Sequence, residues 1–110
     1  MDLLNRFRYW RRWKVGLHVD SVNDVPTRLR RRQAVIVGTS HQKWLAFDCP
    51  CGNGHRVLLN LDGNHYPRWR IASELPLTLI PSVDEESAAG HCHYIVRNGR
   101  IRWVERKGRR

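Results

Sequence analysis

The chain has few cysteines, few acidic residues and no long hydrophobic run. Its 110 residues include only three cysteines, an odd number that argues against a disulfide framework and favours a reducing compartment. No apolar run approaches the roughly 20 residues of a membrane-spanning helix. The N-terminus is too rich in arginine for the apolar core of a secretory signal. These absences predict a soluble, cytoplasmic protein.

Acidic residues are outnumbered two to one, with 10 Asp and Glu against 20 Lys and Arg, for a formal net charge of +10. Such an excess favours nucleic acid or an acidic protein as a partner. The alternative is that the basic termini only keep the protein in solution. A length of 110 residues with 41% hydrophobic residues suffices for one small domain, which a structural metal would help to stabilise.

Two of the three cysteines lie in one short turn, Cys-Pro-Cys-Gly at residues 49–52, and His55 follows it. Proline fixes one φ angle and glycine permits a tight reversal, so both sulfurs can face one ion. The obvious source of a further ligand is the His-Cys-His run at 91–93. We therefore predict a tetrahedral zinc site made by Cys49, Cys51, His55 and Cys92. Ordinary buried cysteines are the alternative, because a single CxC is a weaker indication than two cysteine pairs.

Alternating and short apolar runs predict a mainly β fold: a small single domain of short antiparallel strands and hairpins built round a zinc-knuckle-like site. Residues 2–13 fit a short amphipathic helix or an extended basic arm. The acidic stretch 84–90 reads as a flexible loop. The cysteine turn is predicted at the tip of a hairpin, and the expected strands are 14–19, 34–37, 44–47, 56–61, 67–71, 75–80, 94–97 and 100–103.

The last hairpin is predicted in most detail, because Asn98-Gly99 between two apolar runs is typical of a two-residue type I′ turn. That turn sets Tyr94 opposite Trp103 on one apolar face. Since side chains alternate along a strand, Cys92 shares the apolar face and His93 points to the other. The sequence thus separates a buried metal ligand from an imidazole that is free for a different role.

Several blocks follow one another in an order that resembles a known family. They are Phe-Asp-Cys-Pro-Cys-Gly at 47–52, Leu-Leu-Asn-Leu at 58–61, Pro-Arg-Trp-Arg at 67–70, Leu-Ile-Pro-Ser-Val at 79–83, Cys-His-Tyr-Ile at 92–95 and Asn-Gly-Arg-Ile-Arg-Trp at 98–103. The chain resembles the bacterial domain-of-unknown-function family numbered 6527, often encoded beside ubiquitin-like, E1-like and E2-like proteins. The resemblance covers about residues 34–104, so we expect a basic arm and first strand at 1–33, a zinc-bound β domain at 34–104 and a basic tail at 105–110.

The resemblance implies a serine-type peptidase that processes the C-terminus of a ubiquitin-like modifier or removes the modifier from its targets. By position, Ser82 would be the nucleophile and His93 its general base, with E1-like or E2-like proteins as further partners. Family members often carry a cysteine where this chain has Asn53. His55 is therefore the expected substitute ligand, with His91 in reserve.

The chemistry needs these groups, because a serine hydroxyl becomes a good nucleophile only when a neutral imidazole accepts its proton. Asp84, Asp62 or a backbone carbonyl would orient that imidazole. Four protein ligands indicate a closed, structural zinc, and a catalytic zinc with an open position is the alternative. Two non-enzymatic functions also stay open: a zinc-ribbon-like module that binds nucleic acid or an acidic protein, and a structural partner that positions conjugation enzymes.

Overall fold

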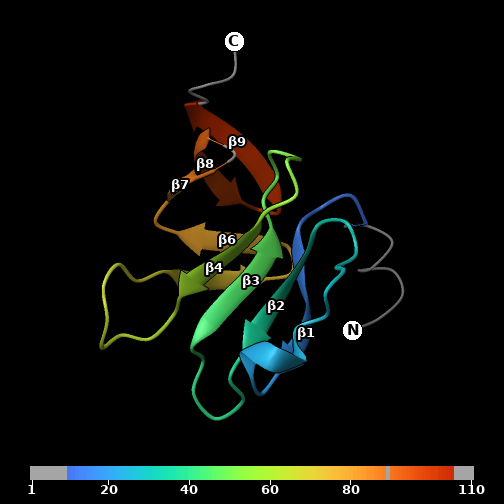
Figure 1. The fold of residues 1–110 in the computed structure, drawn as a ribbon, viewed down its shortest axis with the longest axis vertical. Coiled ribbons are helices and arrows are strands. Elements are labelled where there is room, and N and C mark those ends of the chain that lie inside the picture. The colour runs from blue at the N-terminus through green and yellow to red at the C-terminus, as the bar shows by residue number, and fades with distance from the viewer. Residues whose placement is uncertain (1–9, 89, 106–110) are drawn as a thin grey trace.

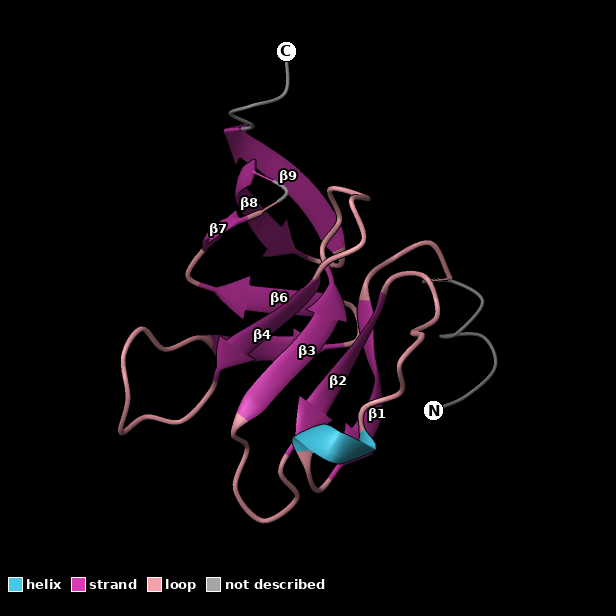
Figure 2. Ribbon diagram, in the orientation of Figure 1, coloured by secondary structure: helices cyan, strands magenta, loops and turns pink. Residues whose placement is uncertain are grey.

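The described part of the chain consists of nine short strands and one helical turn. The computed structural model describes residues 10–88 and 90–105. The fold is mainly β, as predicted, and Figure 2 shows a single helical turn among the strands. The elements are Lys14–Val19 (β1), Val22–Asp24 (η1, a 3₁₀ turn), Gln33–Val37 (β2), Trp44–Asp48 (β3), Arg56–Asn60 (β4), Arg70–Glu74 (β5), Leu77–Ile80 (β6), Val83–Ser87 (β7), Gly90–Arg97 (β8) and Arg100–Glu105 (β9). No helix within these residues is long and apolar enough to cross a membrane.

The strands form three sheets, in the orders β1-β2-β3-β4, β5-β6 and β7-β8-β9. In Figure 1 the β7–β9 sheet lies toward the C-terminal end of the molecule, with β6 between it and the loop that joins β2 to β3. All pairs are antiparallel except β1 and β2. The parallel pair was not predicted; it arises because the segment 20–32 carries the chain back to the end of the sheet where β1 began. The predicted N-terminal helix falls mainly on residues 1–9, which lie outside the described residues.

One hydrophobic core joins the three sheets. The inward face of the four-stranded sheet meets apolar side chains from β6, β7 and β8, and Tyr94 is fully buried among them. Burial of this shared face holds the sheets together, because apolar area removed from water is the main favourable term in folding. The buried members are Val15, Ala34, Ile36, Leu45, Phe47, Cys49, Val57, Leu59, Leu61, Leu77, Leu79, Val83, Cys92, Tyr94 and Val96.

The acidic stretch 84–90 is not the flexible loop that we predicted. Residues Val83–Ser87 form β7, which pairs with β8 so that Val83 lies opposite Tyr94 and Asp84 opposite His93. Val83 is fully buried, and Asp84 and Glu86 are exposed. The prediction was wrong because charge was taken to indicate a loop, whereas in a strand with one solvated face the acidic residues simply point outward.

Several strand boundaries also differ from prediction; β8, for example, begins at Gly90 and not at residue 94. The strand expected at 67–71 begins only at Arg70, because the Trp69 amide is bonded to the Asn60 carbonyl at the end of β4 (2.8 Å). The strand expected at 75–80 begins at Leu77, because residues 75 and 76 form the turn between β5 and β6. The pairing of β6 with β5 alone within its sheet fits the expected edge strand.

The predicted type I′ hairpin is confirmed. Asn98 and Gly99 both have positive φ (54° and 74°), and Tyr94 pairs with Trp103 as expected. Gly99 is also a junction, since its amide donates to the Leu77 carbonyl (2.7 Å) and its carbonyl accepts from the Trp13 amide (2.8 Å). The turn therefore fixes β8 against β6 and against the start of β1.

We expect Gly99→Ala to lower the free energy of unfolding by about 1–3 kcal/mol, from the positive φ and from overpacking. An added Cβ would lie 2.6 Å from the Arg12 Cβ and 2.9 Å from the Pro76 Cβ. Urea unfolding followed by tryptophan fluorescence measures the change. Asn98→Gly is the matched control, because glycine accepts the same φ, and it should leave the midpoint almost unchanged. Equal midpoints for Gly99→Ala and the unmodified protein would contradict the packing described.

Candidate active site and metal site

The cysteine turn lies at the tip of the β3–β4 hairpin, where we predicted it. Asp48 and Arg56 form the last pair of that hairpin, and the Cys49 amide donates to the His55 carbonyl (3.0 Å). Gly52 takes a positive φ of 81° and donates its amide to the Cys49 carbonyl (3.3 Å). This reversal brings the Cys51 Sγ to 3.7 Å from the His55 Nδ1.

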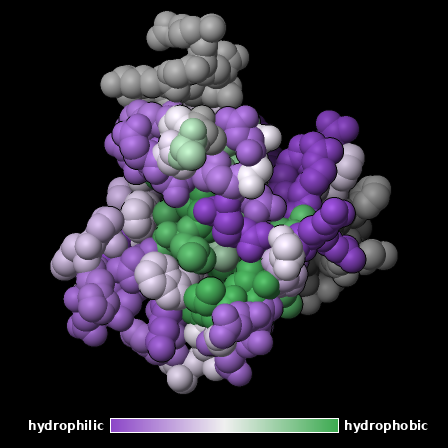
Figure 3. Space-filling view, viewed as in Figure 1, coloured by the Kyte–Doolittle hydropathy of each residue, from purple (hydrophilic) through white to green (hydrophobic). Residues whose placement is uncertain are grey.

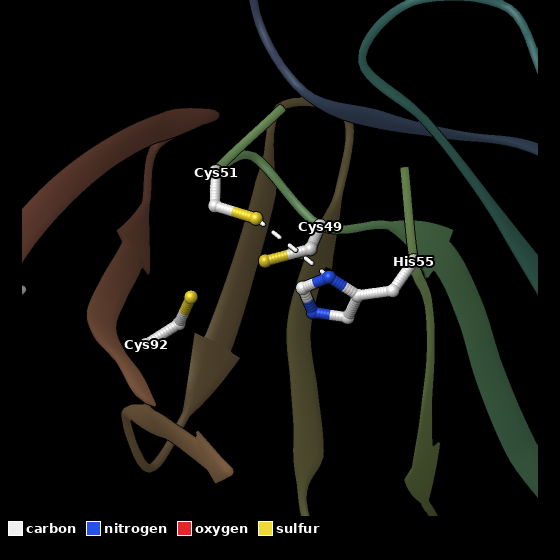
Figure 4. A group of neighbouring side chains, drawn as sticks. All are labelled: Cys49, Cys51, His55 and Cys92. Atoms are coloured by element: carbon white, nitrogen blue, oxygen red, sulfur yellow. Dashed lines mark hydrogen bonds between the residues drawn. The ribbon is translucent and has the colours of Figure 1, made fainter. Parts of the chain in front are cut away.

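The structure brings together all four predicted metal ligands. One ligand atom from each of Cys49, Cys51, His55 and Cys92 lies within 4.8 Å of the others. Figure 4 shows Cys49, Cys51 and His55 arriving from the hairpin and Cys92 from the separate strand β8, with the sulfurs and the imidazole directed toward one another. Ligands about 2.3 Å from a tetrahedral zinc stand about 3.8 Å apart, so the group fits this geometry. These residues can hold a metal ion.

The surroundings of the thiols suit a cation. Burial raises the pKa of the Cys49 thiol to about 12, and burial likewise raises the pKa of Cys92. The Tyr94 hydroxyl is buried and has no hydrogen-bond partner among the described residues, and burial followed by the charge of Cys49 raises its pKa as well. Deprotonation of these closely packed, buried groups is unfavourable without a cation. A bound cation makes deprotonation of the thiols favourable, because a coordinated thiol loses its proton. The donor set and its surroundings therefore fit a structural zinc.

Glu85 adds a feature that the sequence did not reveal. Its Oε1 lies 3.4 Å from the His55 Nε2, the ring nitrogen opposite the one that faces Cys51. Both atoms are buried without a hydrogen bond of good geometry. Metal-binding histidines commonly pair their second nitrogen with a carboxylate, which fixes the ring orientation. Predicting β7 as a strand would have identified Glu85 from the sequence. Its side chain lies between those of Asp84 and Glu86, which point outward, so alternation places Glu85 on the inward face.

The reserve ligand His91 lies outside the four-residue group, and its Nε2 is bonded to the Asp84 carboxylate. Asp84 was also a candidate to orient the ring of His93, but its carboxylate is directed to the ring of His91. Asp62, the other carboxylate considered, contacts His41 (3.4 Å) and His65 (3.7 Å). Within residues 10–88 and 90–105, the ring of His93 has no carboxylate bonded to it.

Ser82 and His93 meet although eleven residues separate them. The Ser82 Oγ lies 3.1 Å from the His93 Nε2, which is hydrogen-bond distance. The cause is local: Ser82 immediately precedes β7, and β7 pairs with β8, which carries His93. A second bond fixes the serine backbone, since the Trp69 indole Nε1 donates to the Ser82 carbonyl (3.2 Å). The sequence did not predict this bond from Trp69.

The burial of neighbouring residues alternates along β8 as predicted. Cys92 is buried beside the hairpin ligands, whereas the next residue, His93, is half-buried and points to the opposite face. The metal group and the Ser82–His93 pair are therefore neighbours in sequence and separate in space.

A serine hydroxyl bonded to an imidazole nitrogen is the arrangement that serine hydrolases use to generate a nucleophile. The described fold is thus a small, mainly β domain in which such a contact is present. The sequence model of one family, described as bacterial ubiquitination-like system serine protease (BubE), matches residues 21–104. The chain belongs to this family. Searches of curated proteins and of solved structures found no match.

The family match begins at residue 21, before the boundary that we predicted at residue 33. In the structure β1 lies in the same sheet as β2, β3 and β4. The predicted division into arm, domain and tail stays a prediction.

Proposed function

We propose that this protein is a peptidase that processes the C-terminus of a ubiquitin-like modifier or removes the modifier from its targets. The observation that carries the proposal is the 3.1 Å contact between the Ser82 Oγ and the His93 Nε2, in a member of a family of serine proteases from ubiquitination-like systems. E1-like and E2-like proteins of such a system are the further partners that we expect.

The reaction uses the pair in two steps. His93 Nε2 accepts the hydroxyl proton while the Ser82 oxygen attacks the carbonyl carbon of the modifier's last residue, and the protonated ring then donates to the leaving amine. This breaks the C–N bond and leaves an ester on Ser82. Water next attacks the ester as His93 takes its proton, and the returning proton releases Ser82 and the free carboxylate. The two residues that carry the reaction in this proposal are thus the serine and the histidine that contact each other at 3.1 Å.

The metal site has a structural role in this proposal. Cys49, Cys51, His55 and Cys92 would hold a zinc ion, which when bound cross-links the β3–β4 hairpin to β8. Four protein ligands close the coordination shell, so no position remains for substrate. The ion would hold Cys92 in place. Because His93 is the next residue, its position relative to Ser82 would be fixed as well.

Two measurements test the proposal. Labelling by a fluorophosphonate, which phosphonylates activated serines with loss of fluoride, should modify Ser82 with one adduct per chain. Incubation with a ubiquitin-like protein carrying a short C-terminal extension should release that extension, as seen by intact mass. Absence of both reactions in zinc-loaded protein would refute the assignment.

Glu85 provides a separate prediction for the metal site. We expect Glu85→Gln to weaken zinc binding about tenfold, within the range of about 10–100-fold for lost outer partners, because the amide orients His55 less well than a carboxylate. Competition with a chromophoric chelator measures the affinity. Glu86→Gln is the matched control: Glu86 is the next residue on β7, is exposed and lies outside the ligand group. Equal zinc affinities for the two variants would show that Glu85 does not support His55.

A further inference from the structure

A groove on the protein surface is lined mainly by apolar and aromatic side chains. Its volume is about 710 Å³, and it opens beside β4 and the loop that follows. In Figure 3, hydrophobic side chains gather near the middle of the face seen in Figure 1, where β3 and β4 lie. The lining residues are Trp44, Leu58, Tyr66, Pro67 and Trp69, with Lys43, Asn60, Asp62 and His65 as the polar members.

The loop that forms one wall is held in a fixed shape. The Asn60 side-chain Nδ2, whose two hydrogens are shared among three acceptors, lies within hydrogen-bond distance of the loop carbonyls of Asp62 (3.0 Å), His65 (3.0 Å) and Pro67 (3.1 Å). Its side-chain oxygen accepts from the Asp62 amide (3.0 Å). One side chain therefore ties the start, middle and end of the loop, which pre-organises the residues it carries.

Asp62 strengthens this arrangement. Its carboxylate accepts from the Asn64 amide (3.0 Å), and that bond, followed by His41, lowers the pKa of the Asp62 carboxyl. His41 and His65 lie on either side of it. The carboxylate is thus committed to the loop, and Lys43 is the remaining charged residue of the lining. A groove with so little positive charge does not suit a phosphate backbone, which needs several cations.

The rigid loop presents an aromatic residue to water. Tyr66 is 86% exposed, and Leu58 across the groove is 44% exposed. Ordering a loop around an exposed tyrosine gains nothing from burial in the free protein. Tyrosine and tryptophan offer a large contact area at a low cost in side-chain entropy, which is why they are enriched where proteins bind peptides. The exposed ring and the fixed loop together indicate a docking surface.

One residue links the groove to the candidate active site. Trp69 lines the groove and donates its indole N–H to the carbonyl of Ser82 (3.2 Å). The groove therefore begins within one side chain of the candidate nucleophile, at a position that a substrate segment next to the scissile bond can reach.

We propose that the groove binds an extended segment of the protein substrate next to the scissile bond and receives a large apolar side chain between Tyr66, Leu58 and Trp69. This inference rests on the proposed function, since it assigns the same site its substrate specificity. The open shape and the mixed aromatic and aliphatic lining suit an extended peptide. The Asp62 carboxylate is already bonded within the loop, so the apolar side chain of the substrate is what determines specificity in this groove.

The test uses the full chain, zinc-loaded and carrying Ser82→Ala, immobilised against a displayed library of random dodecapeptides. We expect the enriched peptides to share a large apolar or aromatic residue. Tyr66→Ala and Leu58→Asn, each added to Ser82→Ala, should weaken binding of a synthesised peptide about tenfold or more, the usual effect at a contact that dominates an interface. Trp10→Ala is the matched control, because Trp10 is an exposed aromatic (60%) outside the groove, and it should change nothing.

No enriched peptide, or an enriched peptide that binds equally to the groove variants, would overturn the inference. Tyr66 is so exposed that its truncation leaves the fold intact, so loss of folding does not confuse the result. Fluorophosphonate labelling of the chain with its serine intact reports on Ser82 and His93 alone. Failed labelling refutes the proposed function, whereas normal labelling with a groove that binds no peptide refutes only the specificity.

Discussion

We expect Ser82→Ala to abolish cleavage of the modifier, with a loss of about 10³-fold or more, because in the proposed mechanism this residue supplies the oxygen that forms the acyl intermediate. His93→Ala gives a loss of similar size, since the hydroxyl then has no base at 3.1 Å. The double variant should be no worse than either single one, because the two residues act as a unit. Intact-mass analysis of the processed modifier measures all three.

Zinc content separates a catalytic defect from a structural one. His93 faces away from the metal group, so both single variants should keep one zinc per chain by elemental analysis. His18→Ala and Ser40→Ala are suitable controls, as both residues are exposed and far in sequence from the pair. Retained activity in purified Ser82→Ala would exclude it as the nucleophile. A loss of zinc in His93→Ala would mean that this ring supports the fold.

Cys92→Ser should release zinc and unfold much of the domain. Structural zinc contributes about 10–16 kcal/mol of apparent binding free energy in zinc-finger peptides, and a serine hydroxyl is a poor replacement for a thiolate. Cys92 is the one member of the ligand group that comes from β8, so its loss uncouples that strand from the hairpin. We expect a large drop in melting temperature, and in fluorophosphonate labelling as well.

The measurements are zinc per chain, thermal unfolding by circular dichroism, and repetition of both with the unmodified protein after chelation. Chelation should reproduce the effect of Cys92→Ser. Asn53→Ala is the control: its side chain lies in the same turn and outside the ligand group. Stoichiometric zinc in Cys92→Ser would show that this cysteine does not close the site.

Local patterns in the sequence predicted the hairpins well, because each depends on a few neighbouring residues. Asn98-Gly99 specified its turn type and therefore the register of β8 against β9. That register in turn predicted that Cys92 and His93 face opposite ways, which burial confirms. The four metal ligands were found from spacing and donor type, and the structure brings them together.

What the sequence did not predict depends on pairings that leave no apolar pattern in the paired segments themselves. The acidic residues of β7 carry no apolar alternation, so the strand is defined only by its partner β8. With β7 taken as a loop, nothing placed Glu85 beside His55 or fixed how Ser82 meets His93. The parallel pairing of β1 with β2 and the bond from Trp69 to Ser82 likewise join residues whose proximity no local pattern encodes.

The order of residues in β8 places a strict limit on length changes in this strand. Side chains alternate along β8, so the number of residues between the Asn98-Gly99 turn and a given position sets the face of the sheet on which its side chain lies. Cys92 and His93 therefore take opposite faces. Deleting one residue between 94 and 97 would exchange the faces of these two side chains, turning the thiol of Cys92 toward solvent and the ring of His93 toward the core. We therefore expect this segment to accept substitutions more readily than any change in its length.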